Sequence, residues 1–206
     1  MTVLENHELI AKISSHGAEL HSLYDKTTKT EYIWQGDKTY WSWHAPICFP
    51  ITGRVHNDEY IFENKKYALT VHGFARDYEF SLLKKTENSV IYELIYNDES
   101  LKVYPFKFSL QLEYVLLENG LQVNYTVKNL EDANKDIFFA LGLHTAYNCP
   151  LEKTDDFEDY ELIFEQKETA KRHFLSNGII NNETADLLND EDTLACLLYT
   201  SPSPRD

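Results

Sequence analysis

The chain has 206 residues, of which 43% are hydrophobic and 14% aromatic, and this is enough apolar material for one sizeable core. Its 19 Lys and Arg residues stand against 34 Asp and Glu residues, which gives a formal net charge of -15. Because such a charge repels phosphate polymers and anionic lipid headgroups, the composition excludes nucleic acid and membrane surfaces as expected partners.

Most of the predicted elements are strands, because apolar and polar residues alternate with a period of two along much of the chain. In chain order, the first alternating stretches are Leu9 to Ile13, Ala18 to Tyr24, Tyr60 to Leu69 around the turn Glu63–Lys66, and Val90 to Tyr96. The clearest pattern follows, with apolar residues at every second position from Phe108 to Leu116 and from Leu121 to Val127. The turn Glu118-Asn-Gly120 separates these two runs, so they predict a β-hairpin with one buried face.

Residues Ile137 to Leu143 are apolar on both faces and predict a central strand. Helix signals are few. Asp98 to Tyr104, stopped by Pro105, predicts one short helical turn, and Asn189 to Ala195 indicates a second. Many strands separated by turns, with almost no helix, predict an all-β protein, either an antiparallel sandwich or a barrel.

Residues 1–195 contain no linker or repeat and are expected to form one domain. Residues 196–206, CLLYTSPSPRD, continue none of the earlier patterns. This run resembles the translation of an adapter used in preparing sequencing libraries, so we expect a non-native tail on a chain that is truncated at its C-terminus.

The cellular location is predicted from the lack of a signal sequence, the lack of a membrane span and the pattern of cysteines. Glu5 and Glu8 precede any apolar run long enough for a signal sequence, and no later stretch approaches the length of a membrane span. Cys48, Cys149 and Cys196 have no motif spacing, which favours reduced thiols. These observations predict a cytoplasmic protein.

Eight histidines raise the question of a metal site or of acid–base chemistry. A metal site needs several of them on one centre with carboxylate or thiolate partners at short spacing, and the sequence has no such spacing. No metal site is therefore predicted. Motifs for a serine nucleophile and for a phosphate-binding loop are also missing, which leaves proton transfer by histidine as the expected chemistry. The histidines in distinctive surroundings are His44, His56, His72 and His144.

His144 is the strongest candidate because it directly follows the predicted strand that ends at Leu143, at the rim of the core. It is either an acid–base group or a partly buried histidine bonded to a backbone carbonyl, and the pattern leaves both open. His72 has the same two interpretations. Gly73 after it permits a backbone bend that suits a turn and a ligand contact equally.

Arg54 follows Gly53 in a loop, where it either presents a forked donor to hydroxyls or a phosphate or forms an ordinary surface salt bridge. Arg76 and Asp77 favour a structural role near a turn. Several aromatic residues are candidate platforms for the apolar face of a sugar, although a chain this rich in aromatics has some in its core regardless. They are Trp34, Trp41, Trp43, Phe74 and Tyr147.

Three blocks occur in an order and spacing that resemble the aldose 1-epimerase (galactose mutarotase-like) family, in particular its LacX-type bacterial branch. They are Phe49-Pro-Ile-Thr-Gly-Arg54, Val71-His-Gly-Phe-Ala-Arg-Asp77 and Leu141-Gly-Leu-His-Thr-Ala-Tyr-Asn-Cys-Pro-Leu151. The resemblance covers nearly the whole chain up to residue 195. It implies an antiparallel β-sandwich of the galactose mutarotase type, incomplete at the C-terminus, with a sugar bound on one sheet.

The resemblance further implies interconversion of the α and β anomers of a free sugar, without metal or organic cofactor. It implies His144 as the general acid for the ring oxygen, with His72 as a second catalytic group and substrate contact. Arg54, Phe74 and Tyr147 are the other expected substrate contacts. The base in such enzymes is a glutamate near the C-terminus. No convincing match is present here, so the chain as written is expected to be inactive.

Two alternatives stay open. Hexose-6-phosphate 1-epimerases share the His-Gly-Phe-Ala-Arg block at residues 72–76, so a phosphorylated substrate is one of them. The other is a carbohydrate-binding protein that has the same fold without turnover. The chain also has His144-Thr145 where many relatives have His-Pro, which can reposition the loop but not the imidazole.

Overall fold

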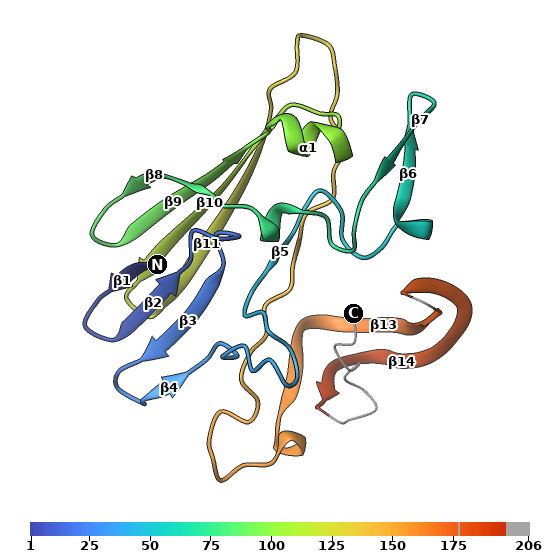
Figure 1. Ribbon diagram of the computed structural model, residues 1–206. Coiled ribbons are helices and arrows are strands. Elements are labelled where there is room, and N and C mark those ends of the chain that lie inside the picture. The colour runs from blue at the N-terminus through green and yellow to red at the C-terminus, as the bar shows by residue number, and fades with distance from the viewer. Residues whose placement is uncertain (177, 197–206) are drawn as a thin grey trace. The chain divides into compact units, whose positions relative to one another are not determined.

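The structure is a computed structural model that describes residues 1–176 and 178–196, shown as a ribbon in Figure 1. It divides into two compact units, Met1–Asn148 and Cys149–Asp206, and each is described by itself. Within the described residues, no helix is both long and apolar enough to cross a membrane. The tail predicted at 196–206 lies, apart from Cys196, outside the described residues.

The first unit is built on two four-stranded antiparallel sheets, one at the start of the chain and one from its middle (Figure 1). The first sheet has the order β1-β2-β3-β4, with bounds Thr2–Glu5, Leu9–Ile13, Leu20–Asp25 and Thr30–Glu31. The second has the order β11-β10-β9-β8, where β8 is Ser81–Lys85, β9 is Ser89–Ile95, β10 is Phe108–Leu117 and β11 is Gly120–Asn129.

Smaller elements complete the first unit. Two short pairs of strands are β5 (Ile47–Cys48) with β12 (Gly142–Leu143), and β6 (Glu59–Phe62) with β7 (Lys65–Ala68). The helical turns are η1 (His56–Asp58), η2 (Ala75–Asp77) and α1 (Asp98–Val103). The hairpin predicted around residues 63–66 is confirmed. Its turn is formed by Glu63 and Asn64, which both have positive φ, as a tight hairpin turn requires.

The strongest prediction from the alternation, the hairpin of β10 and β11, is confirmed. Phe108 pairs with Asn129 and Leu117 pairs with Gly120, so the register is continuous from end to end. The side chains of one parity on β10 are almost fully buried, at 3% exposure or less. They are Phe108, Leu110, Leu112, Tyr114 and Leu116.

The two large sheets of the first unit cover one core. Leu4 and Ile13 from the first sheet and Val90 and Leu110 from the second belong to the same buried cluster. A hydrogen bond also joins the layers, because the Tyr114 hydroxyl donates to the carbonyl of Ala18 at 2.7 Å. This arrangement is an antiparallel β-sandwich, one of the two all-β architectures that the alternation left open.

Removal of that hydroxyl tests the join between the layers. We expect Tyr114→Phe to lower the free energy of unfolding by about 1–3 kcal/mol, because the buried Ala18 carbonyl loses its donor. Tyr40→Phe is the matched control, since Tyr40 is 77% exposed. Chemical denaturation followed by tryptophan fluorescence measures both, and equal stability of the two variants would contradict the role given to Tyr114.

The helix predicted at Asp98 to Tyr104 is confirmed as α1. Asn97 caps it, because its side chain accepts from the backbone N–H of Ser100 while the Ser100 hydroxyl accepts from the backbone N–H of Asn97. Tyr104 stands next to Pro105, where the helix has ended. Local sequence is therefore sufficient to fix this element.

The helix predicted at Asn189 to Ala195 is wrong. These residues form the end of β14 (Ile179–Ala195) in the second unit, which also contains η3 (Phe157–Asp159) and β13 (Glu161–Ser176). Ala195 lies opposite Glu161, and Thr193 lies opposite Ile163. Hydrogen bonds to the partner strand satisfy the backbone here, and they override a weak local preference for helix.

The central strand predicted at Ile137 to Leu143 is also wrong in its extent. Within the described residues, only Gly142 and Leu143 pair, with β5, and Ile137 to Leu141 run as irregular chain. Phe138 is 63% exposed and Phe139 is 46% exposed, so no second layer covers this segment within the first unit. An apolar run becomes a central strand only where strands flank both edges and layers cover both faces.

Candidate functional site

The Val71–Phe74 segment folds into a tight turn that lies against Phe49. Both His72 and Gly73 adopt left-handed backbone conformations, with φ of 63° and 75°. The Phe49 carbonyl accepts from the backbone N–H of Phe74 at 3.0 Å, and the Phe49 N–H donates to the His72 carbonyl at 3.0 Å. A Cβ on Gly73 would lie 2.2 Å from the Phe49 carbonyl oxygen. Only glycine fits at this position.

The same turn fixes the imidazole of the buried residue His72. The backbone N–H of His72 donates to the Gly53 carbonyl at 2.8 Å, and the Gly53 N–H donates to Nδ1 of the His72 ring at 3.1 Å. Because Nδ1 acts as an acceptor, the proton of the neutral ring is on Nε2. His72 is therefore held in one orientation and in one tautomer.

His144 is brought beside His72 by the pairing of β5 and β12. It follows Leu143, and its backbone N–H donates to the carbonyl of Pro46 at 3.1 Å. The ring centres of His72 and His144 lie 5.2 Å apart with an interplanar angle of 73°. The tilted Trp41 ring lies 5.1 Å from the His144 ring. The structure thus brings the two predicted catalytic histidines together beside an indole.

Arg54 is positioned by the loop that holds His72, since it is the residue after Gly53. Its side chain is exposed, and its Nε lies 3.5 Å from an Asp58 carboxylate oxygen. An exposed ion pair of this kind contributes little free energy and costs little to rearrange. The guanidinium can therefore exchange Asp58 for hydroxyls of a bound molecule.

Comparison with known proteins identifies the family to which this chain belongs. A family model described as aldose 1-epimerase matches residues 1–191. The chain belongs to the aldose 1-epimerase family. It is 35% identical over 189 residues to the plasmid and chromosomal LacX proteins of Lactococcus lactis, which is 88% of this chain and 62% of each relative. The chain thus spans 62% of the length of these curated relatives.

Solved structures of the family share the fold. A galactose mutarotase related enzyme from Lactobacillus acidophilus is 34% identical with a TM-score of 0.86, over 94% of this chain and 64% of that one. A galactose mutarotase-like protein from Lactobacillus casei is 39% identical with a TM-score of 0.83, over 95% and 67% of the two chains. The predicted all-β fold of the galactose mutarotase type is confirmed.

In this aldose 1-epimerase family member, the other two predicted substrate contacts lie in different surroundings. Phe74 is 7% exposed, and its ring packs against the buried ring of Phe49 and the partly buried ring of Tyr78. Tyr147 is 67% exposed and lies opposite Ile33 in an isolated bridge. A substrate contact by either residue stays a prediction, and burial leaves little of the Phe74 ring for it.

The contacts of Arg76 within the protein explain its presence in the Val71–Asp77 segment without a bound ligand. Its guanidinium donates to the carbonyl of Val71 at 3.2 Å and lies 5.0 Å from the ring centre of Trp43. Asp77 ends the short turn η2. These contacts favour the structural role that the sequence suggested for Arg76.

The sequence did not specify the contact that Trp41 makes with the site. Trp41 is one of several candidate sugar platforms in the sequence, and only the folded chain shows its ring beside His144. Its position is held in part by the Trp34 indole N–H, which donates to the Trp41 carbonyl at 2.8 Å. The signal in the sequence is the Trp41-Ser-Trp-His44 run, which is too aromatic to single out one ring.

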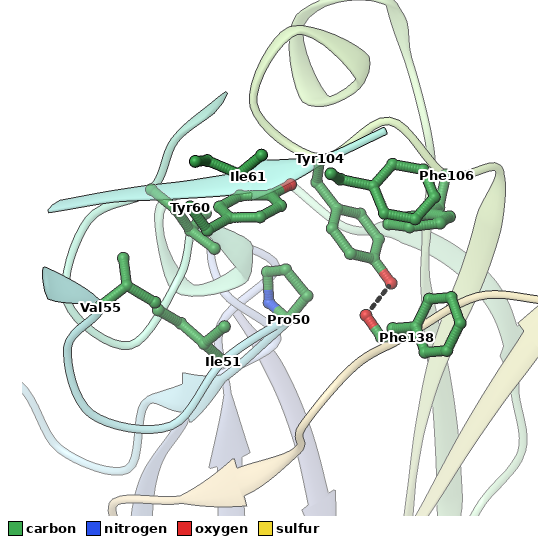
Figure 2. Close-up of a pocket in the computed structure, with 10 residues that line it drawn as sticks. Pro50, Ile51, Val55, Tyr60, Ile61, Tyr104, Phe106 and Phe138 are labelled. Carbon is green, nitrogen blue, oxygen red and sulfur yellow. Dashed lines mark hydrogen bonds between the residues drawn. The ribbon is translucent and has the colours of Figure 1, made fainter. Parts of the chain in front are cut away.

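A separate cavity of about 460 Å³ lies among apolar side chains of the first unit (Figure 2). Two of its tyrosine hydroxyls are engaged, since Tyr104 donates to the Phe138 carbonyl at 3.0 Å and Tyr60 donates to the Val103 carbonyl at 2.8 Å. Burial, with the neighbouring Tyr67, raises the pKa of Tyr60 to about 12. The cavity offers apolar surface more than the polar groups that orient a sugar, so the histidines remain the better candidate site. Its lining residues include Pro50, Ile51, Val55, Ile61 and Phe106.

Proposed function

We propose that this protein is an aldose 1-epimerase that interconverts the α and β anomers of a free hexose. The observation that carries the proposal is the placement of His72 and His144, with ring centres 5.2 Å apart, next to the loop of Arg54. Membership of the aldose 1-epimerase family supports a sugar as the substrate.

The reaction needs one proton to be delivered and one to be removed. In our proposal His144 donates a proton to the ring oxygen as the bond from that oxygen to the anomeric carbon breaks, while a base takes the proton of the anomeric hydroxyl. The open-chain aldehyde then rotates about the bond between its first two carbons. Ring closure reverses both proton transfers, so the enzyme returns to its starting state.

His72 and Arg54 have supporting roles in this proposal. His72, whose proton is on the buried Nε2, lies beside His144 and stabilises the charge that develops there during ring opening. Arg54 supplies a forked donor to neighbouring hydroxyls. Trp41 and Tyr147 offer aromatic faces for the apolar side of the sugar ring.

The base is the part of the mechanism for which this chain offers no candidate by resemblance. Glu161, Glu165 and Glu191 are exposed residues on β13 and β14 of the second unit, in a sequence context unlike that of the expected glutamate. We therefore propose that the 206-residue chain has little mutarotase activity. Loss of a general base typically removes a factor of roughly 10²–10⁴ in rate.

Polarimetry on freshly dissolved α-glucose and α-galactose tests both parts of this proposal. We expect slow mutarotation with the 206-residue chain and fast mutarotation with a form extended to the length of its relatives. Rapid mutarotation by the chain alone would contradict the need for a further base. An extended form that binds these sugars without accelerating the reaction would favour the binding protein. Faster turnover of glucose 6-phosphate would favour the phosphosugar enzyme.

A further inference from the structure

Three side chains with metal-binding chemistry meet in the first unit, outside the set proposed for the sugar. They are Glu19, His21 and His44, and one ligand atom from each lies within 4.8 Å of the other two. Glu19 directly precedes β3 and His21 is the second residue of that strand, so the two are two residues apart and share one face of the extended chain. His44 joins them from a distant loop, so spacing in the sequence could not reveal the cluster.

The Glu19 carboxylate is held in place for such a role. Glu19 is only 5% exposed, and its Oε1 accepts from the backbone N–H groups of His44 at 2.7 Å and Ala45 at 2.9 Å. Its Oε2 lies 3.0 Å from Nε2 of His21 and 4.0 Å from Nδ1 of His44. One oxygen thus anchors the carboxylate to the backbone, and the other faces both imidazoles.

The His44 ring is also fixed, and one of its nitrogens is buried. The Cα of Gly36 packs so closely that a Cβ there would lie 2.8 Å from Cε1 of His44. On the side toward Glu19, Nδ1 of His44 is buried and has no hydrogen-bond partner among the described residues. A buried polar atom without a partner is costly, so a group that bonds to this nitrogen would be favoured.

His21 is the member that must move. Its ring stacks on that of His44 with centres 4.0 Å apart and planes 9° apart, which directs the nitrogen lone pairs side by side and not toward one point. The His21 side chain is 27% exposed, against 17% for His44 and 6% for Glu19, so it has the most space in which to turn. Rotation of this one ring would bring its Nε2 toward the point faced by the other two ligands.

We propose that Glu19, His21 and His44 bind one divalent transition metal ion, with zinc as the type case. Two imidazole nitrogens and one carboxylate oxygen suit zinc and its neighbours, whereas calcium and magnesium prefer oxygen ligands alone. A zinc ion with these ligands keeps one position open for water. The net charge of -15 favours a cation at the protein surface. The proposal does not depend on the proposed epimerase function.

Calorimetric titration of the untagged chain with Zn²⁺ tests the site. We expect one equivalent to bind, and we expect His21→Ala and His44→Ala to weaken binding by more than the roughly 10- to 100-fold that loss of an outer partner typically costs. His16→Ala is the matched control. His16 lies 3.2 Å from Glu79, a histidine–carboxylate pair that no third ligand joins among the described residues, and its loss should leave the affinity unchanged.

Two further measurements make the result decisive. Circular dichroism without metal checks the fold of each variant, and His21→Gln replaces His21→Ala if the alanine variant does not fold. The titration is repeated on Cys149→Ser, because Cys149 contacts Cys196 in the second unit and the two thiols offer a competing zinc site. The proposal is overturned if no zinc binds, if the zinc bound disappears in Cys149→Ser, or if folded His21 variants bind as tightly as the parent chain.

Discussion

His144→Ala is expected to lower kcat for mutarotation by roughly 10²–10⁴-fold, the typical contribution of a positioned acid. The measurement uses whichever form is active in polarimetry, the chain alone or one extended to the length of its relatives. The backbone contact of residue 144 with Pro46 remains in this variant, whereas the ring contacts with Trp41 and His72 are lost, so circular dichroism checks that the fold is retained. KM should change less than kcat, since proton delivery is needed in the transition state and not for binding.

Two variants separate proton transfer from other effects. His144→Gln keeps a hydrogen-bonding side chain but has no titratable proton, so it should be as impaired as His144→Ala. His56→Ala is the control, because His56 is an exposed histidine in η1, two residues after Arg54, and no catalytic role is proposed for it. If His144→Gln retains most of the activity, His144 positions the sugar and another group is the acid.

Much of the fold could be predicted because local patterns coincide with the final contacts. Alternation between Phe108 and Leu116 marks the face that is buried, and the turn at Glu118–Gly120 joins the two strands in register. In the same way, Pro105 ends the helix that Asn97 begins. In each case the neighbours in sequence are the residues that determine the structure.

The two wrong elements depend instead on partners that are distant in sequence. Ile137 to Leu143 has the composition of a buried strand, but in the first unit only its last two residues pair. Asn189 to Ala195 has a weak helical signal, and pairing with β13 makes it a strand. Composition states what a segment can bury, whereas the available neighbours decide whether it is buried.

The candidate site also combines groups that local sequence identifies with contacts that only distant pairing creates. Residue type and flanking strands identified His72 and His144, but their contact depends on the β5–β12 pairing and on the turn at Gly73. The proposed metal site left no sign in the spacing of the sequence, because Glu19 and His44 meet only through the folded chain. Short-range patterns thus identify the chemical groups, and long-range pairing decides which of them meet.

Gly73→Ala is expected to lower the free energy of unfolding by about 2–5 kcal/mol, the sum of left-handed strain and a steric clash. The new Cβ would lie 2.2 Å from the Phe49 carbonyl oxygen, and both groups are fixed to the backbone. Relief of this clash must move the turn that carries His72. In whichever form is active in polarimetry, this variant should therefore also lose mutarotase activity, even at denaturant concentrations at which it is still folded.

Two other glycines separate these causes, because each lacks one or both of them. Gly53 has a φ of 75° but no described atom within 4 Å of the position that a Cβ would take, so Gly53→Ala should cost about 1–2 kcal/mol from strain alone. Gly120 has neither a positive φ nor a close neighbour among the described residues, so Gly120→Ala should change stability by less than about 0.5 kcal/mol. Denaturation curves should rank the three variants in this order of cost: Gly73, then Gly53, then Gly120. A Gly73→Ala chain as stable as Gly53→Ala would mean that the turn can shift away from Phe49, and the rigid placement of His72 would then be wrong.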